Sequence, residues 1–166
     1  MINGKTVAIV PGSFDPITNG HIDIAQRAAE KYDIVYLAVM VNPKKQYMFT
    51  IEQRENIAKK AVSEIKNVSV ISSEGMLWKL AQDLHADAIV KGYRNDIDYE
   101  YEMNMARFNH EHYPLAETVL LKANDKLVQM SSTLLREKIN NNEAFEECLP
   151  PAAADEVKRI LFDLYQ

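Results

Sequence analysis

Short apolar runs alternate with longer amphipathic segments along the chain. The apolar runs are rich in β-branched residues and predict five strands, at residues 6–10, 34–41, 68–72, 88–91 and 118–122. The amphipathic segments between and after them predict helices, at residues 21–32, 50–65, 75–85, 98–112, 132–142 and 152–165. Strands that alternate with helices in this way build a parallel sheet with helices on both faces. We therefore expect an α/β protein with a doubly wound, five-stranded parallel sheet.

Local signals support the helix boundaries and indicate one domain. Thr50, followed three residues later by Gln53, is typical of a capping box, and a proline pair interrupts the chain before the last helix. No linker, repeat or low-complexity segment separates the predicted elements. We expect residues 1–166 to form a single Rossmann-like domain whose last part, residues 151–166, is a helical segment.

Composition narrows the class of protein. Hydrophobic residues make up 47% of the 166 residues and charged residues 26%, which is typical of a folded globular protein. The formal net charge of −5 argues against a nucleic-acid partner, which would need a basic face. The chain shows neither a secretory signal nor an apolar run of the roughly 20 residues that span a bilayer, so we expect a cytoplasmic protein without a membrane partner. The one cysteine, Cys148, has no partner for an intramolecular disulfide and indicates a structural thiol.

The segment after the first predicted strand has the pattern of an anion-binding loop. It runs from Pro11 to His21 and contains two glycines, Gly12 and Gly20, that allow a ligand to approach the backbone closely. The main-chain N–H groups at the start of the following helix would point into this loop, and phosphate is the ligand that we expect there. In the first helical turn, the positive end of the helix dipole favours a neutral imidazole at His21. The competing interpretation is an ordinary strand-to-helix loop with a capping Thr or Asn.

Two other predicted strands run into basic loops. The second strand is followed by Lys44 and Lys45, and the fourth by Lys91 and Arg94. Because open α/β sheets place ligands outside the carboxyl ends of their strands, these cations lie where an anionic ligand would bind. The competing interpretations are a solvated surface for the lysine pair and, for the other pair, ion pairs with the acidic residues of the next helix.

These motifs resemble those of a known enzyme superfamily. Residues 18–21, Thr-Asn-Gly-His, match the [TH]-x-G-H motif of the nucleotidylyltransferases, and the whole loop is similar to that of the bacterial phosphopantetheine adenylyltransferases. The resemblance extends from Val7 to Pro150, with the motifs in the same order and spacing. It implies transfer of adenylate from ATP to 4′-phosphopantetheine, which gives dephospho-coenzyme A and pyrophosphate. An acceptor that is already anionic needs no general base and no covalent nucleophile, and the sequence shows neither.

The resemblance also assigns roles to individual residues. The catalytic side chains that it implies are His21, Lys45 and Arg94. The residues that it implies for 4′-phosphopantetheine binding are Ser13, Lys45, Leu77, Lys91 and Asn109. The residues that it implies for ATP binding are Ser13, Phe14, His21, Gly92, Tyr93, Arg94, Glu102, Leu127, Val128, Gln129, Met130, Ser131, Ser132 and Thr133.

The chain departs from the family pattern at Lys91, where family members usually carry arginine. Lysine keeps the charge but loses the planar fork that binds two phosphate oxygens, so we expect weaker or altered acceptor binding. Glu102 would repel phosphates and is expected to contact ribose hydroxyls or to orient a cation such as Arg94. The hydroxyls of residues 131–133 either cap the helix that they open or, with its amides, hold the β- and γ-phosphates.

The resemblance further implies that Mg²⁺ bridges the phosphates of ATP and that the protein forms a homohexamer built from two trimers. It leaves open whether coenzyme A inhibits the enzyme.

The sequence leaves two other functions open. A related enzyme could use cytidine triphosphate and an alcohol phosphate, against which the loop at residues 11–21 and the segment 91–94 argue. A regulator could bind nucleotide or coenzyme A without catalysis, against which the intact His21, Lys45 and Arg94 argue.

Overall fold

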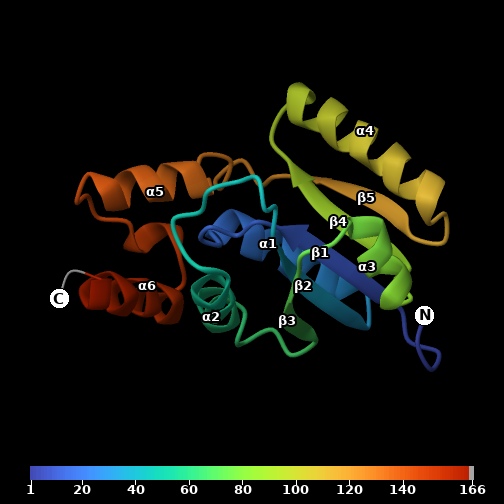
Figure 1. The fold of residues 1–166 in the computed structure, drawn as a ribbon, viewed down its shortest axis with the longest axis horizontal. Coiled ribbons are helices and arrows are strands. Elements are labelled where there is room, and N and C mark those ends of the chain that lie inside the picture. The colour runs from blue at the N-terminus through green and yellow to red at the C-terminus, as the bar shows by residue number, and fades with distance from the viewer. Residues whose placement is uncertain (165–166) are drawn as a thin grey trace.

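The computed structural model describes residues 1–164 and contains a five-stranded sheet (Figure 1). The strands are β1 (Val7–Gly12), β2 (Ile34–Met40), β3 (Val68–Ser73), β4 (Ala88–Tyr93) and β5 (Glu117–Lys122). They lie in the order β3-β2-β1-β4-β5, and every neighbouring pair is parallel. The chain order reverses between β1 and β4, so the predicted doubly wound, Rossmann-like α/β fold is confirmed.

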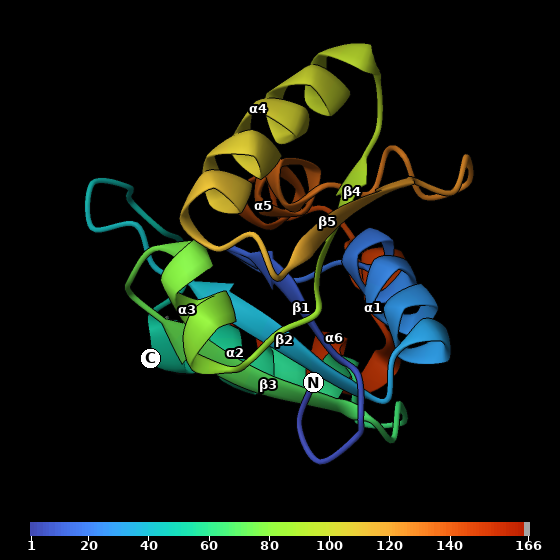
Figure 2. The same cartoon turned by 90° about the vertical axis from the view of Figure 1, so that its right-hand side faces the viewer.

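Helices cover both faces of this sheet. Residues 1–164 contain α1 (Asn19–Lys31), α2 (Ile51–Ala61), α3 (Leu77–Asp83), α4 (Asp96–His112), α5 (Ser132–Asn140), a short 3₁₀ helix (Glu146–Cys148) and α6 (Pro151–Leu164). One face is packed against α1, α2, α5 and α6. The other is packed against α3, next to α4, which lies beside β4 and β5 (Figure 2). None of these helices is long and apolar enough to cross a membrane.

The capping box predicted from Thr50 and Gln53 is present at the start of α2. The Gln53 N–H donates to Thr50 Oγ1 at 3.1 Å, and the Thr50 N–H donates to Gln53 Oε1 at 3.0 Å. The helix ends at Ala61 instead of residue 65, and a turn follows. The last helix begins directly after the first of the two prolines, whereas its predicted final position, residue 165, lies outside the described residues.

Most of the other element ends differ from the predicted ones by one or two residues, and two of these differences have an identifiable cause. β1 continues to Gly12 instead of ending at residue 10, because Pro11 and Gly12 still pair with β2. α4 begins at Asp96 instead of residue 98, because the Asn95 side chain caps it by accepting a hydrogen bond from the Asp98 N–H. Both changes bring regular structure closer to the loops that carry the predicted site.

The alternation of side chains along β1 divides the core between the two faces of the sheet. Ala8 and Val10 belong to a large apolar cluster with α1, α2, α5 and α6, whereas Val7 and Ile9 belong to a smaller one beneath α3. Cys148 is buried in the larger cluster, where burial raises the pKa of its thiol. This environment is that of a structural thiol.

Gly12 ends β1 with the Phe14 ring directly against it. A Cβ atom on Gly12 would lie 2.9 Å from Phe14 Cε1 and Cζ, which is closer than carbon atoms pack. Phe14 has little freedom to yield, because it is 3% exposed and has a left-handed φ of 47°. The packing gives a second reason for glycine here, besides the close approach of a ligand.

We expect Gly12→Ala to lower the free energy of unfolding by about 1–3 kcal/mol, because the added methyl group overpacks this contact. Urea titration of the variant and the wild type measures the difference. Gly75→Ala is the matched control, since a Cβ there meets nothing within 4 Å and the backbone is not in the left-handed region. Equal destabilisation by both substitutions would contradict the steric explanation.

Candidate active site

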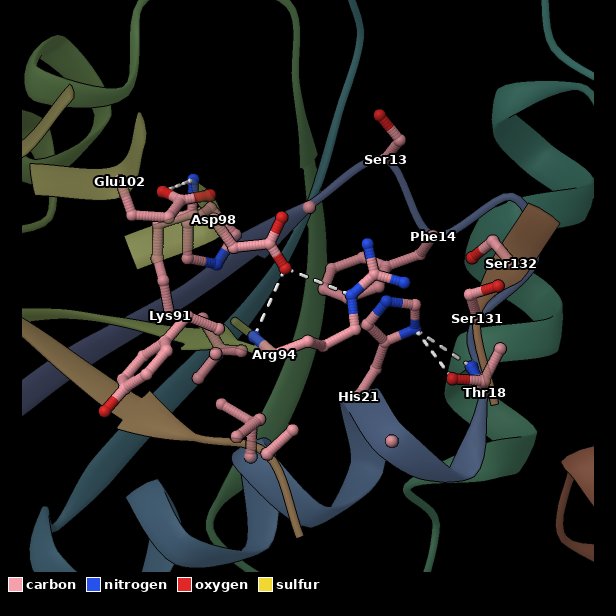
Figure 3. Close-up of a pocket in the computed structure, with 18 of the residues that line it drawn as sticks. Ser13, Phe14, Thr18, His21, Lys91, Arg94, Asp98, Glu102, Ser131 and Ser132 are labelled. Carbon is pink, nitrogen blue, oxygen red and sulfur yellow. Dashed lines mark hydrogen bonds and ion pairs between the residues drawn. The ribbon is translucent and has the colours of Figure 1, made fainter. Parts of the chain in front are cut away.

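A cavity of about 620 Å³ opens at the carboxyl ends of β1 and β4, where the strand order reverses (Figure 3). The sequence-assigned residues that line it are Ser13, Phe14, His21, Lys45, Leu77, Lys91, Gly92, Tyr93, Arg94, Glu102, Leu127, Val128, Met130, Ser131, Ser132 and Thr133. Two assigned residues are not brought to it. Asn109 is buried near the end of α4, and Gln129 is exposed in the loop before α5.

The first turn of α1 holds the His21 ring in a defined orientation. The Thr18 N–H donates to His21 Nδ1 at 3.0 Å, and the Phe14 ring packs edge-on against the imidazole with 5.1 Å between ring centroids (Figure 3). Because Nδ1 accepts this hydrogen bond, the proton of the neutral ring must be on Nε2. His21 therefore presents Nε2–H as a donor on the side of the ring away from Thr18.

The electrostatic environment keeps this ring neutral. Burial, and after it the positive charge of Arg94, lowers the pKa of His21 from 6.5 to about 4. The helix dipole is the reason to expect a neutral imidazole from the sequence, and in the folded chain burial and then Arg94 lower the pKa in the same direction.

We expect His21 to remain neutral, with its proton on Nε2, as the pH falls to about 5. Its folded-state pKa lies below the unfolded value, so the unfolded chain takes up the proton first. The free energy of unfolding should therefore decrease as the pH falls from 6.5 to about 4, and His21 should contribute no such loss above that window. A ¹⁵N NMR titration of the imidazole reports both tautomer and midpoint, and a midpoint near 6.5 or a proton on Nδ1 would contradict this expectation.

The N-termini of α1 and α5 meet at the cavity, and hydrogen bonds connect them. Thr18 Oγ1, at the start of α1, donates to the Met130 carbonyl at 2.9 Å, and Ser132 Oγ, at the start of α5, donates to the Pro16 carbonyl at 2.8 Å. Ser131 caps α5 by accepting a hydrogen bond from the Leu134 N–H at 3.1 Å, so the predicted capping role is present. Its own O–H remains able to donate to a ligand. Together the two helix ends form an anion-binding corner.

Two carboxylates of α4 hold the cations at the end of β4. Lys91 Nζ lies 2.6 Å from Glu102 Oε2, and Arg94 Nε lies 3.1 Å from Asp98 Oδ2 (Figure 3). The competing interpretation of ion pairs with this acidic helix is thus realised, although all four side chains also line the cavity. Glu102 thus pairs with a cation, as one of its two expected roles requires, but that cation is Lys91, and the partner of Arg94 is Asp98. An anionic ligand would have to compete with both carboxylates.

Lys45 reaches the cavity from the loop between β2 and α2. Its Nζ lies 3.4 Å from Ser13 Oγ, which brings the loops after β1 and β2 together. The far end of the Lys45 loop is attached by Asp15, whose carboxylate accepts hydrogen bonds from the Met48 and Phe49 N–H groups at 2.9 and 3.0 Å. Lys44, the other lysine of this loop, does not line the cavity.

Outside the assigned list, the residues that line the cavity and make polar contacts there include Thr18, Asp98 and Arg136. The spacing of Thr18 to His21 is that of a capping box, and Asp98 follows Arg94 by four residues, so local signals for both were available. Arg136 Nη1 donates at 2.8 Å to the Asp15 carbonyl, which lies in the loop after β1 and far from Arg136 in the sequence. No local pattern indicates a contact of that kind.

Two solved structures share the fold of this chain. A proposed nicotinate-nucleotide adenylyltransferase from Vibrio parahaemolyticus superposes with a TM-score of 0.70 at 15% identity, over 93% of both chains. A bifunctional NMN adenylyltransferase/ADP ribose pyrophosphatase from Francisella tularensis gives 0.66 at 13% identity, over 93% of this chain and 49% of the other. At these identities the similarity establishes the fold alone.

Sequence comparison identifies the class and then the family. A family model described as cytidylyltransferase-like matches residues 9–138, which places this chain among the nucleotidyltransferases. Phosphopantetheine adenylyltransferases from Heliobacterium modesticaldum and Lactobacillus acidophilus are 42% and 39% identical, over 89% and 94% of this chain and 88% and 98% of their own. The chain belongs to the phosphopantetheine adenylyltransferase family.

Proposed function

We propose that this enzyme transfers the adenylyl group of ATP to 4′-phosphopantetheine, forming dephospho-coenzyme A and pyrophosphate in the penultimate step of coenzyme A synthesis. The observation that carries the proposal is one cavity that joins a neutral, oriented His21 to Lys45, Lys91, Arg94 and two helix N-termini. This arrangement suits two phosphate-bearing substrates placed end to end. Membership of the family supports the choice of substrates.

At the acceptor end, Ser13, Lys45 and Lys91 bind the phosphate of 4′-phosphopantetheine. One of its oxygens attacks the α-phosphorus of ATP, and the new P–O bond forms as the bond from that phosphorus to the α–β bridging oxygen breaks. The electron pair of the broken bond leaves with pyrophosphate. The acceptor brings its own anionic oxygen, so catalysis rests on positioning and charge neutralisation.

At the nucleotide end, His21 Nε2–H donates to a non-bridging oxygen of the α-phosphate, where negative charge grows in the transition state. Arg94 and the amides that open α5 hold the leaving pyrophosphate. Arg94 then exchanges its Asp98 partner for phosphate oxygens. Leu77 lines the acceptor side, whereas a contact with Asn109 would require the pantetheine arm to extend beyond the cavity.

Magnesium binds to the enzyme together with the nucleotide substrate, as MgATP. Asp98 and Glu102 fit poorly as metal ligands because each already holds a cation. Residues 1–164 also contain no group of three or more His, Cys, Asp or Glu side chains placed to bind a metal ion. Phosphate oxygens are the ligands that Mg²⁺ commonly takes in such enzymes.

The setting of the reaction is proposed from the family resemblance and the composition of the chain. Residues 1–166 act as one nucleotidylyltransferase domain in the cytoplasm, and six copies form the homohexamer. Coenzyme A carries the same pantetheine arm as the product, so it would compete for the cavity. Light scattering tests the hexamer, and an inhibition series with coenzyme A tests the feedback.

Lys91→Arg is expected to lower the KM for 4′-phosphopantetheine about threefold to tenfold, since a guanidinium can bind two phosphate oxygens at once. The KM for ATP should change little. Steady-state kinetics at saturating MgATP measures the effect, and Lys79→Arg, an exposed residue paired with Asp83, is the control. An unchanged or higher acceptor KM would show that the lysine does not weaken acceptor binding.

The function is tested by identifying the product. The enzyme is incubated with 4′-phosphopantetheine and either ATP or cytidine triphosphate, and the products are analysed by mass spectrometry. Dephospho-coenzyme A from ATP supports the proposal. A cytidylyl product would indicate a cytidylyltransferase, and tight nucleotide binding without any product would indicate a regulator.

A further inference from the structure

Arg54 is a buried cation beside the active site that the mechanism above does not use. It lies on α2 and is 1% exposed. Within residues 1–164 no carboxylate forms an ion pair with it, and its buried Nε has no hydrogen-bond partner. Burying a charge without a counter-charge is costly, so the position of this guanidinium calls for an explanation.

The guanidinium joins three segments that surround the acceptor end of the cavity. Arg54 Nη1 donates to the Ser13 carbonyl at 2.8 Å and to the Met40 carbonyl at 3.2 Å. Its Cζ lies 3.8 Å from the centroid of the Tyr47 ring. Ser13 follows β1, Met40 ends β2, and Tyr47 belongs to the loop that carries Lys45.

Contacts continue from Tyr47 to the ammonium group of Lys45. The Tyr47 hydroxyl accepts a hydrogen bond from the Asn42 N–H at 2.9 Å, and the Lys45 N–H donates to the Asn42 carbonyl at 3.0 Å. Lys45 Nζ lies 5.6 Å from the Tyr47 ring centroid and 3.4 Å from Ser13 Oγ. Arg54 is thus hydrogen-bonded directly to the Ser13 carbonyl, and its contact with the Tyr47 ring supports the loop that carries Lys45.

We propose that Arg54 is a positioning residue for the acceptor phosphate. It holds Ser13 and the Lys45 loop in one geometry, and its unbalanced charge favours an anion where they meet. Arg54 does not line the cavity, so it acts through these neighbours. The inference rests on the proposed function, which places the acceptor phosphate at Ser13 and Lys45.

Arg54→Lys tests the proposal because lysine keeps the charge but cannot bond two carbonyls while stacking on an aromatic ring. We expect the KM for 4′-phosphopantetheine to rise about tenfold, with the KM for ATP within about twofold of wild type. A purely structural role would change both constants alike. Tyr47→Leu, at a half-buried surface position, keeps the arginine and should raise the acceptor KM about threefold even if the Arg54 variant folds poorly.

A second readout separates this inference from the identity of the substrate. Inorganic phosphate is titrated into both variants and wild type, with the Ser13 and Lys45 amides followed by NMR. We expect about tenfold weaker phosphate binding in Arg54→Lys and no change in the control Arg159→Lys, an exposed residue of α6. If the wild type makes no dephospho-coenzyme A yet phosphate binding weakens as expected, the proposed function fails and the role of Arg54 stands. Unchanged phosphate binding in both test variants, or an equal rise in both KM values, overturns the role of Arg54.

Discussion

Replacing His21 with alanine should lower kcat about 10²–10³-fold while the KM for ATP stays within about threefold of wild type. The Thr18 N–H fixes Nδ1 as an acceptor, and burial with Arg94 lowers the pKa of the ring to about 4, so Nε2–H is a neutral donor at working pH. A donor aimed at charge that develops on the α-phosphate stabilises the transition state more than the bound substrate. Steady-state and single-turnover kinetics separate the two constants.

His110→Ala is the matched control for this experiment. His110 is an exposed histidine of α4 and does not line the cavity, so its removal should leave both constants near wild type. Proportional losses of kcat and of ATP affinity in His21→Ala would indicate a ground-state contact and contradict the assigned role.

Arg94→Ala should lower kcat/KM for ATP about 10²–10³-fold, because the variant loses the cation proposed to hold the leaving pyrophosphate. Arg94→Lys should recover part of this loss, since lysine restores the charge but not the bidentate fork. The alanine variant should also raise the pKa of His21, because the charge of Arg94 contributes to lowering it. Kinetics and the NMR titration of His21 are measured on the same samples.

Arg107→Ala serves as the control for Arg94→Ala. Arg107 is an exposed arginine of α4 that donates to the Asn104 side chain and does not line the cavity. A similar loss of activity in both variants would mean that net charge, and not the position of Arg94, controls the reaction. A His21 pKa that is unchanged in Arg94→Ala would contradict the electrostatic coupling.

The sheet and most of the cavity could be predicted from the sequence because their signals are local. Strands that are buried on both faces must be apolar along their length, so β1, β2 and β4 could be predicted from short apolar runs in the sequence. The rule that ligands lie at the carboxyl ends of such strands then placed Lys45, Lys91 and Arg94 at one edge. The structure brings all three to one cavity.

The details that could not be predicted depend on contacts between distant segments. Arg54 has the sequence context of any amphipathic helix, and only the folded chain places it against the carbonyls of Ser13 and Met40. The choice of Glu102 as the partner of Lys91 depends on how α4 lies beside β4, which periodicity does not report. For the same reason the motif around Gln129 could not show that its side chain is exposed.

Pyrophosphate release from MgATP, measured with and without 4′-phosphopantetheine, tests the proposed reaction most directly. We predict release that requires both substrates, that is not seen when cytidine triphosphate replaces ATP, and that His21→Ala reduces about 10²–10³-fold. Release without the acceptor, or comparable release from cytidine triphosphate, would contradict adenylyl transfer to 4′-phosphopantetheine.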